Sequence, residues 1–337
     1  MRKKQDNRWG SRASPMTRFV ARTAAQLLSR GRSQGSLLIL IYHRVFAEPD
    51  PLLEDVPDAA TFSAHMDLVA GVLNVLPLSE AIARLSRQAL PARAACITFD
   101  DGYANNLSVA LPILQARKLP ATVFVSTSFV EGGRMWNDTI IGAVRSATAI
   151  LDLTFVGLGV HPTHDVASRR VAVASLIDQL KYLDPKIRSE RVEAIAREAG
   201  LVPAEKLMMN EIQLRELASA GIEIGAHTVT HPILTRLGEK EAHAEILASK
   251  FRLQEIVGSP VTCFAYPNGR PGQDYDARHV EMVKSCGYSC AVSTAWGACR
   301  ADSDRFQLPR IAPWDQTPAR FAARMIGTYL AAAATIV

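Results

Sequence analysis

From Leu37 onward the chain alternates short, β-rich apolar runs with longer segments in which apolar residues recur at helical spacing. Short apolar runs are typical of buried strands, whereas recurrence every three or four residues is typical of amphipathic helices. The expected strands are Leu37–Tyr42, Ala94–Phe99, Ala121–Ser126, Ile222–Ala226, Val261–Ala265 and Ser289–Val292. This alternation predicts repeated β-α units around parallel strands, so we expect an α/β fold.

The segments between the expected strands carry helix signals. Thr61 and Ser79 are expected to be N-caps, and Ser79 opens a helical run at 80–85. Gly238–Val257 has apolar residues at helical spacing and ends before Gly258. We expect these segments to be the helices that connect the strands.

The stretch from Gly132 to Leu207 interrupts the alternation. It carries two amphipathic patterns, near Val171–Leu183 and Ile187–Ala199. We interpret about residues 132–209 as a mainly helical insertion into one domain at residues 36–315. A chain of 337 residues is long enough for one large barrel with an insertion, so two independent domains are not required.

The first 35 residues differ in charge from the rest of the chain. They hold nine Arg or Lys against Asp6 alone, a net charge of +8, so the remainder sums to −3 in a chain whose total is +5. Because Arg18 and Arg22 interrupt the apolar stretch of this segment, a secretory signal is not expected. We expect a basic tail or an amphipathic helix on anionic lipid, and a cytoplasmic or inner-membrane-surface location. Nucleic-acid binding is not expected, because no interleaved aromatic residues support it.

The C-terminal segment, residues 316–337, is expected to form a helix that packs on the domain or lies against a membrane. Its apolar run from Phe321 carries Arg324 and is too short to span a bilayer. We therefore expect no transmembrane span.

Several potential metal ligands are not expected to bind metal. The five cysteines form no C-x-x-C pair, which is typical of buried free thiols in a reducing compartment. They are Cys96, Cys263, Cys286, Cys290 and Cys299. Cys286 and Cys290 could share a helix face, but no histidine lies near enough to complete a zinc set. His161 and His164 lie in a Pro-containing loop, which is typical of a solvated turn.

Two adjacent carboxylates, Asp100 and Asp101, follow the expected strand Ala94–Phe99 and precede Gly102. That position is the carboxyl end of a strand, where β/α folds gather their functional sites. Adjacent carboxylates repel one another in a partly buried site unless a cation or hydrogen bonds compensate, so the pair implies a positive partner. By themselves, these residues also fit a turn that starts a helix near Asn105.

A histidine pair, His227 and His231, follows the expected strand Ile222–Ala226. A four-residue step lets both imidazoles face one point if the turn is helical. A carboxylate with two neutral imidazoles is a recognised ligand set for zinc or a similar divalent ion. Thr228 and Thr230 are expected to orient the rings. An isolated H-x3-H also fits two unrelated histidines.

The sequences Thr-Phe-Asp-Asp-Gly at 98–102 and His-Thr-Val-Thr-His-Pro at 227–232 resemble, nearly letter for letter, motifs of the polysaccharide deacetylase family, also called the NodB-homology family or carbohydrate esterase family 4. The motifs occur in the family's order, and the resemblance covers Leu37 to about Ile311 apart from the insertion. It implies an irregular (β/α)7-type barrel and an acetylated glycan or lipid-linked glycan as substrate. It also implies one divalent metal ion, which we expect to be zinc, with cobalt, nickel or manganese as alternatives.

The resemblance further implies a role for each motif residue. Asp101, His227 and His231 would hold the metal, and Asp100 would be the general base. This division agrees with the chemistry, because a carboxylate that does not bind the metal is free to take a proton from water.

The acid is expected from an early histidine. The family's late Leu-x-His motif is missing, because no histidine follows His279. Ile41–Val45, however, resembles the YHRV-like segment of the subgroup that acts on exopolysaccharide poly-N-acetylglucosamine, in which an N-terminal histidine is the acid. This resemblance implies that His43 has that role.

The segment Phe264–Gly269 resembles the family's Arg-x-Pro-Tyr motif but departs from it. Ala265 stands where an arginine would orient the base, and Asn268 replaces the tyrosine. The missing guanidinium is expected from Arg310, whose segment resembles the subgroup's late arginine motif. An oxyanion or substrate contact is expected at Asn268, through a backbone N–H, and at Tyr266.

These features favour a metal-dependent N-deacetylase of GlcNAc-type glycans, acting in cell-surface or exopolysaccharide biosynthesis. Trp136, at the start of the insertion, is the best candidate for stacking on a sugar ring. Two alternatives stay open. An O-acetyl esterase would use the same attack by water, and a silent glycan-binding protein of the same fold would explain Ala265 and the missing Leu-x-His motif.

Overall fold

The computed structural model describes residues 14–30, 35–131, 133–202, 206–315, 317–330 and 336–337. At its centre is a seven-stranded sheet whose strand pairings are all parallel. The strands are β1 (Leu37–Tyr42), β2 (Asn74–Val75), β3 (Ala94–Phe99), β4 (Thr122–Val125), β7 (Glu223–Ala226), β8 (Cys263–Ala265) and β9 (Cys290–Val292). They follow the order β1-β3-β4-β7-β8-β9, with β2 paired to β3. The predicted α/β class is confirmed.

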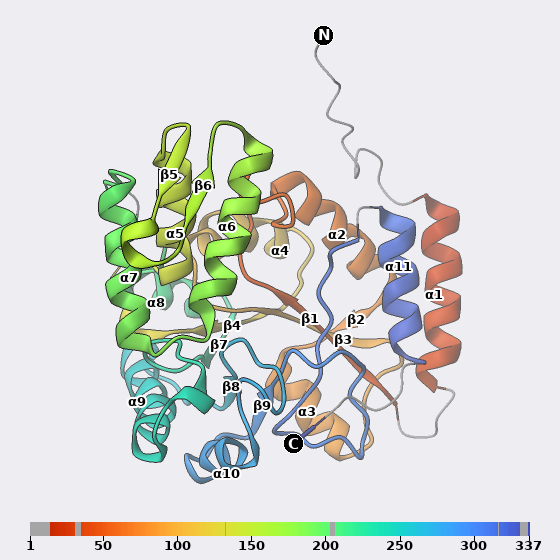
Figure 1. The fold of residues 1–337 in the computed structure, drawn as a ribbon. Helices are drawn as coiled ribbons and strands as arrows, with labels where there is room; N and C mark the ends of the chain where they lie inside the picture. Colours follow the sequence, from red (N-terminus) through yellow and green to blue (C-terminus); the bar gives the residue numbers. More distant parts are fainter. Residues whose placement is uncertain (1–13, 31–34, 132, 203–205, 316, 331–335) are drawn as a thin grey trace.

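One segment after β9 joins the two edges of the sheet. Leu308 forms a parallel bridge with Val292 of β9, and Ile311 forms one with Leu40 of β1. Because the same segment bonds to both edge strands, the sheet curls into an irregular barrel (Figure 1). The expected (β/α)7-type barrel is thus confirmed.

Both faces of the strands are buried, which explains why their sequences are almost wholly apolar. In β1, Leu38 and Leu40 belong to the core between sheet and helices, whereas Leu37 and Ile39 belong to the barrel interior. The helices around the barrel are α2 (Ala59–Val72), α3 (Leu78–Ser86), α4 (Leu111–Gln115), α8 (Glu211–Ser219), α9 (Glu239–Val257) and α10 (Ala277–Ser285). Short helical turns lie at Asn106–Ala110, Thr127–Phe129, Thr154–Val156 and Leu234–Arg236.

The observed helix starts correct two predictions. Asp58 caps α2 and accepts a hydrogen bond from the N–H of Thr61 at 2.7 Å, so Thr61 lies inside the first turn. Helix α3 begins at Leu78, and Ser79 is its second residue. The carboxylate of Glu223, from β7, accepts hydrogen bonds from the N–H groups of both Leu78 and Ser79 and so does the work of a cap.

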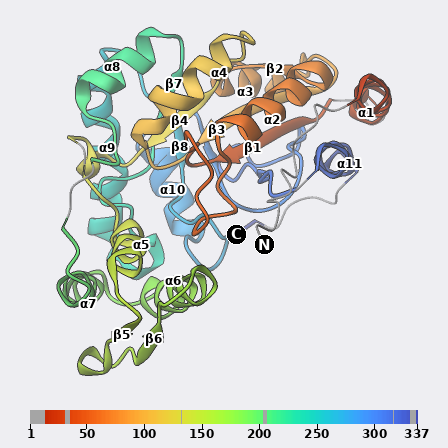
Figure 2. The same cartoon turned by 90° about the horizontal axis from the view of Figure 1, so that it is seen from above.

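The region predicted as an insertion forms a unit with its own small core, built around Ile140, Leu151, Leu176 and Ile195. Its elements are α5 (Trp136–Ser146), β5 (Ile150–Asp152), β6 (Val160–Pro162), α6 (Val166–Lys181) and α7 (Pro185–Glu198). Figures 1 and 2 show that it projects from one side of the barrel. The prediction that His161 lies in a solvated turn is wrong. Its imidazole is buried in β6, with Nε2 2.9 Å from the carbonyl oxygen of Leu158.

The two terminal helices pack together on the opposite flank. Helix α1 (Pro15–Arg30) contacts α11 (Pro318–Thr328), and both contact α2. The rest of the predicted basic tail, residues 1–13 and 31–34, lies outside the described residues. Among the helices that the structure describes, none is long and apolar enough to cross a membrane.

All five cysteines lie within the described residues, and each is free and buried, as predicted. Cys286 ends α10 and Cys290 lies in β9, so the two do not share a helix face. The pair therefore does not form the zinc site that their spacing could have suggested.

Candidate active site

The carboxyl ends of β3 and β7 bring together three groups that could hold a metal ion. Asp101 follows β3, and His227 and His231 follow β7. One carboxylate oxygen of Asp101 and one ring nitrogen of each histidine all lie within 4.8 Å of one another. The strand order places β4 between β3 and β7, so these loops meet across the barrel mouth.

Asp101 is buried and faces both imidazoles. Its Oδ1 lies 3.5 Å from Nε2 of His227 and 3.4 Å from Nε2 of His231. Among the described residues no group donates a hydrogen bond to this oxygen. Burial by itself raises the pKa of Asp101, but His227, His231 and His43 together lower it well below its usual value. A buried, ionised and unsatisfied oxygen beside two imidazole nitrogens fits a divalent cation.

The two histidines are held by different contacts. Nδ1 of His227 lies 2.7 Å from the carbonyl oxygen of Ala265, which fixes the ring so that Nε2 faces Asp101. Burial lowers the pKa of His227, but the neighbouring carboxylates of Asp101 and Asp100 outweigh burial and raise the pKa above 6.5. Burial lowers the pKa of His231 to about 4.

The turn between the histidines is fastened by Glu245 of α9. Its Oε2 accepts hydrogen bonds from the N–H groups of Val229 and Thr230, each at 2.8 Å, and its Oε1 accepts one from the Thr230 hydroxyl at 2.7 Å. The Thr228 hydroxyl accepts a hydrogen bond from the N–H of His231 at 3.1 Å. The prediction that both threonines orient the rings is therefore wrong in detail: they fix the backbone of the turn.

Backbone conformation marks the same loops. Asp101, Thr228, His231 and Asn268 have φ values of 77°, 65°, 55° and 59°. Residues other than glycine rarely adopt this left-handed conformation, and such strained positions concentrate at functional sites.

Asp100 points to a different partner from that of Asp101. Its two carboxylate oxygens accept hydrogen bonds from Nη1 and Nη2 of Arg310 at 2.7 and 2.8 Å. Arg310 is itself buried, and its Nε donates to the carbonyl oxygen of Ser293 at 2.8 Å. Burial raises the pKa of Asp100, but Arg310 and His227 outweigh burial and keep it below its usual value. The segment that closes the barrel thus positions this carboxylate.

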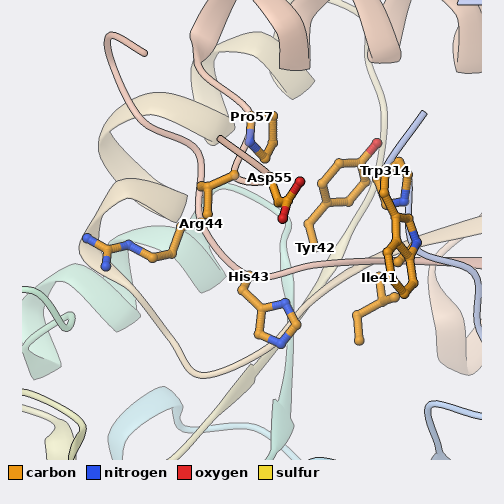
Figure 3. Close-up of a pocket in the computed structure, with 10 residues that line it drawn as sticks. Ile41, Tyr42, His43, Arg44, Asp55, Pro57 and Trp314 are labelled. Carbon is orange, nitrogen blue, oxygen red and sulfur yellow. The ribbon is translucent and has the colours of Figure 1, made fainter. Parts of the chain in front are cut away.

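His43 lies just beyond β1 and lines a pocket of about 230 Å³ with Asp55 and Trp314. Figure 3 shows its ring and the Arg44 side chain pointing in different directions. The imidazole is exposed, and its charge contributes to lowering the pKa of both Asp100 and Asp101. His43 therefore lies at the edge of the same site.

The side chains of Tyr266 and Trp136, which were predicted to contact the substrate, are less accessible to it than expected. The Tyr266 side chain is buried in the core outside the barrel and stacks on Tyr275 with ring centroids 3.8 Å apart. A direct contact between this side chain and a substrate is therefore not supported.

Trp136 packs against the core of the insertion, and the Arg188 guanidinium lies 5.0 Å from its ring centre. One ring face is thus occupied, which weakens its role as a platform for a sugar. Asn268 is half-buried in the loop after β8.

A buried charge cluster beside the site was missed by the sequence reading. Asp138 of α5 accepts hydrogen bonds from Nη1 of Arg44 at 2.9 Å and from the Tyr103 hydroxyl at 3.1 Å. Arg44 follows His43, and Tyr103 follows the Asp101-Gly102 turn. Asp138 therefore ties the insertion to both loops of the site. Sequence spacing does not predict contacts between residues so far apart in the chain.

Known proteins share sequence and fold with this chain. The family model described as polysaccharide deacetylase matches residues 87–151 and 190–291, and the gap between them falls within the insertion. The chain is 27% identical to YxkH of Bacillus subtilis over 127 residues, which are 38% of this chain and 44% of that protein. The alignment thus spans less than half of that relative.

Two solved structures share the fold. The Streptococcus pyogenes deacetylase PplD, in complex with acetate, has 19% identity and a TM-score of 0.60, covering 87% of this chain and 99% of its own. IcaB from Ammonifex degensii has 20% identity and a TM-score of 0.54, covering 86% of this chain and 98% of its own. The solved structures show the same fold, and the matched family model shows that this chain belongs to the polysaccharide deacetylase family.

Proposed function

We propose that this protein is a metal-dependent glycan deacetylase that hydrolyses N-acetyl groups on GlcNAc-type units to acetate and a free amine. One observation carries the proposal: the unsatisfied Oδ1 of Asp101 faces two imidazole nitrogens, while the neighbouring Asp100 is turned away and held by Arg310. One carboxylate is thus available to bind a cation, and the other stays outside the ligand set.

Asp101, His227 and His231 would hold one divalent ion, for which we propose zinc, with cobalt, nickel or manganese as alternatives. Carboxylate and imidazole donors of this number and kind suit such ions and leave coordination positions open. A bound ion would acidify a water molecule and polarise the acetyl carbonyl.

Asp100 is proposed as the general base. Arg310 keeps its carboxylate ionised, because the two guanidinium nitrogens favour the charged form. Each carboxylate oxygen accepts one hydrogen bond from Arg310 and retains a lone pair, so a water proton can transfer to either oxygen. Arg310 acts through Asp100 and is a positioning residue.

His43 is proposed as the acid that protonates the leaving amine. Its exposed ring reaches the pocket, where an acetylated sugar could enter, and its charge acts on both carboxylates. The backbone N–H of Asn268 is proposed as an oxyanion donor. Trp314, whose side chain is exposed on the same pocket, could stack on a sugar ring.

We further propose that the substrate is a polymer or a lipid-linked glycan of cell-surface or exopolysaccharide biosynthesis. The resemblance of Ile41–Val45 to the poly-N-acetylglucosamine subgroup supports this class. A cytoplasmic or inner-membrane-surface location stays a prediction from the charge pattern of the chain.

The test compares acetate release from N-acetylated and O-acetylated oligosaccharides by the zinc-loaded protein. We expect release from the N-acetylated substrate, and Asp100→Asn should lower kcat by about 10²- to 10⁴-fold because the base is lost. Asp152→Asn, an exposed carboxylate of the insertion, is the control and should leave kcat unchanged. Release from the O-acetylated substrate alone would favour the esterase.

His43 is tested in the same assay. His43→Ala should lower kcat by about 10²-fold or more, whereas His164→Ala, which removes an exposed imidazole of the insertion, should not. Full turnover by His43→Ala would exclude this residue as the acid. No acetate release from either substrate by folded, metal-loaded protein would favour the silent binding protein.

A further inference from the structure

The outward face of α1 is apolar. Met16, Phe19, Val20 and Leu27 are 76%, 72%, 58% and 67% exposed. The inward face is made mostly of small side chains, with Ala21 and Ala25 at 2% and 0% exposure, and Leu28 packs partly buried against the core. This reverses the usual pattern of a surface helix, in which bulky apolar side chains face the core and polar side chains face solvent.

The four exposed residues lie in one row along the helix, with the exposed Thr23 between Val20 and Leu27. Positions 16, 19, 20 and 27 fall on the same side of a helix with 3.6 residues per turn. The other side of α1 packs against α2 and α11, so the row faces away from the protein. Figures 1 and 2 both show α1 at the outer edge of the molecule, beyond α11. Exposed apolar side chains that gather on one side of a helix mark an interaction site.

The net charge of the N-terminal segment indicates the kind of partner. The first 35 residues carry a net charge of +8, whereas the remaining residues sum to −3. Arg22 is exposed on α1, beside the row. An apolar row in a basic segment suits an anionic bilayer, in which apolar side chains enter the acyl boundary and basic side chains such as Arg22 meet phosphate groups. Two copies of this segment would instead repel one another.

We propose that the outer face of α1, defined by Met16, Phe19, Val20 and Leu27, binds the surface of an anionic phospholipid membrane. The helix lies on the membrane and does not cross it, because no described helix is long and apolar enough to span. The mildly acidic body of the protein then faces away from the lipid phosphates.

The pocket lies on the same flank of the protein as the proposed membrane-binding face of α1. The pocket residues Ala312 and Trp314 lead directly to Thr317, which caps α11, and α11 packs on α1. The pocket rim and the membrane-binding helix thus belong to one flank of the molecule. If the proposed function holds, this arrangement serves a glycan that is attached to a lipid anchor.

The test is co-sedimentation of the full chain with vesicles of phosphatidylcholine alone or mixed with phosphatidylglycerol. We expect binding to the mixed vesicles only. Phe19→Asp combined with Leu27→Asp should weaken that binding at least about tenfold, because two apolar side chains leave the acyl boundary. The matched control is Ile212→Asp combined with Phe251→Asp, at residues 72% and 60% exposed on α8 and α9, which should bind as wild type.

Circular dichroism and light scattering complete the design. The α1 variant should keep the wild-type melting temperature and the wild-type acetate release from a soluble oligosaccharide, so a loss of binding is separate from a failure of the proposed function. Equal loss in both variant pairs, or equal binding to both vesicle types, would overturn the proposal. If the wild type is a dimer and the α1 variant is a monomer, this face instead binds a second copy of the chain.

Discussion

A carboxylate at each end of the barrel interior differs in the hydrogen bonds that the protein supplies to it. At the amino end, Glu223 accepts hydrogen bonds from the Leu78 N–H, the Ser79 N–H and the Thr122 hydroxyl at 3.1, 3.3 and 2.7 Å. At the carboxyl end, Oδ1 of Asp101 has no donor among the described residues. Both carboxylates lie at a strand end, so their position in the fold does not explain the difference.

The surroundings of the two ends differ in the same sense. The amino end is filled by apolar side chains and thiols, including Leu37, Cys96 and Cys263. The carboxyl end gathers buried Asp100, Asp101, His227 and Arg310. A carboxylate whose hydrogen bonds the protein itself supplies needs no ligand, whereas a buried oxygen left unsatisfied indicates one. At the amino end the protein itself supplies the hydrogen bonds of the carboxylate, whereas the carboxyl end combines a satisfied carboxylate, Asp100, with one that has an oxygen free for a ligand, Asp101.

The largest effect is expected when the paired charge at the carboxyl end is broken. Arg310→Met should lower the free energy of unfolding by about 3–5 kcal/mol, because Asp100 stays buried without a counter-charge. Urea denaturation measures this loss. Replacing both residues, with Asp100→Leu and Arg310→Met, should recover most of the stability but not the acetate release. An unchanged unfolding midpoint for Arg310→Met would show that this pair does not stabilise the barrel.

A smaller effect is expected from the support of the histidine turn. Glu245→Gln should weaken zinc binding by about 10- to 100-fold, since the amide cannot match the three hydrogen bonds that order the loop between His227 and His231. Titration calorimetry measures this affinity. Glu255→Gln, an exposed carboxylate of the same helix, is the control and should bind zinc as wild type does. Equal zinc affinities for both variants would show that Glu245 does not support the metal-binding histidines.

The pH dependence of zinc binding provides a third test. The pKa of His227 is raised above 6.5, so in the metal-free protein a proton occupies this ligand at a higher pH than for an ordinary histidine. As the pH falls through that pKa, protons compete with the metal, and affinity should fall about tenfold per pH unit. His231, with a pKa of about 4, should add to the slope only in more acidic buffer. Affinity that rises as the pH falls would contradict this ligand set.

The smallest effect is expected at the amino end. Cys263→Ala should cost about 1 kcal/mol of stability, because the buried thiol packs against Cys290, with the sulfur atoms 3.4 Å apart. Zinc affinity and acetate release should stay at wild-type values, as measured by the same calorimetry and assay. A change in zinc affinity would show that the two ends are coupled and would break the comparison.

The sequence predicted the elements best where burial decides them. The bounds of β1 and β3 were predicted correctly because uninterrupted apolar runs leave no other reading, and the remaining predicted strands were longer than the observed ones by one or two residues. Helix starts were less predictable. Asp58 lies close enough in the chain to replace Thr61 as the cap, and the cap of α3 comes from Glu223, a residue distant in sequence.

The site was predictable where its residues are neighbours in short motifs. Asp100, Asp101, His227 and His231 stand out through spacing and through resemblance to a family. The contacts of Asp138 with Arg44 and Tyr103 join three separate segments and follow no periodicity. The burial of Tyr266 also could not be predicted, because an aromatic residue at a strand end can turn to either side of the sheet.

The central claim is that Asp101, His227 and His231 form a metal site, and metal content measures it most directly. Elemental analysis should find about one zinc or cobalt ion per wild-type chain after loading, and none in His227→Ala. His164→Ala should retain the wild-type content, because its imidazole lies exposed in the insertion. A wild-type chain that takes up no divalent ion, or a His227→Ala variant that binds as much as wild type, would contradict the account.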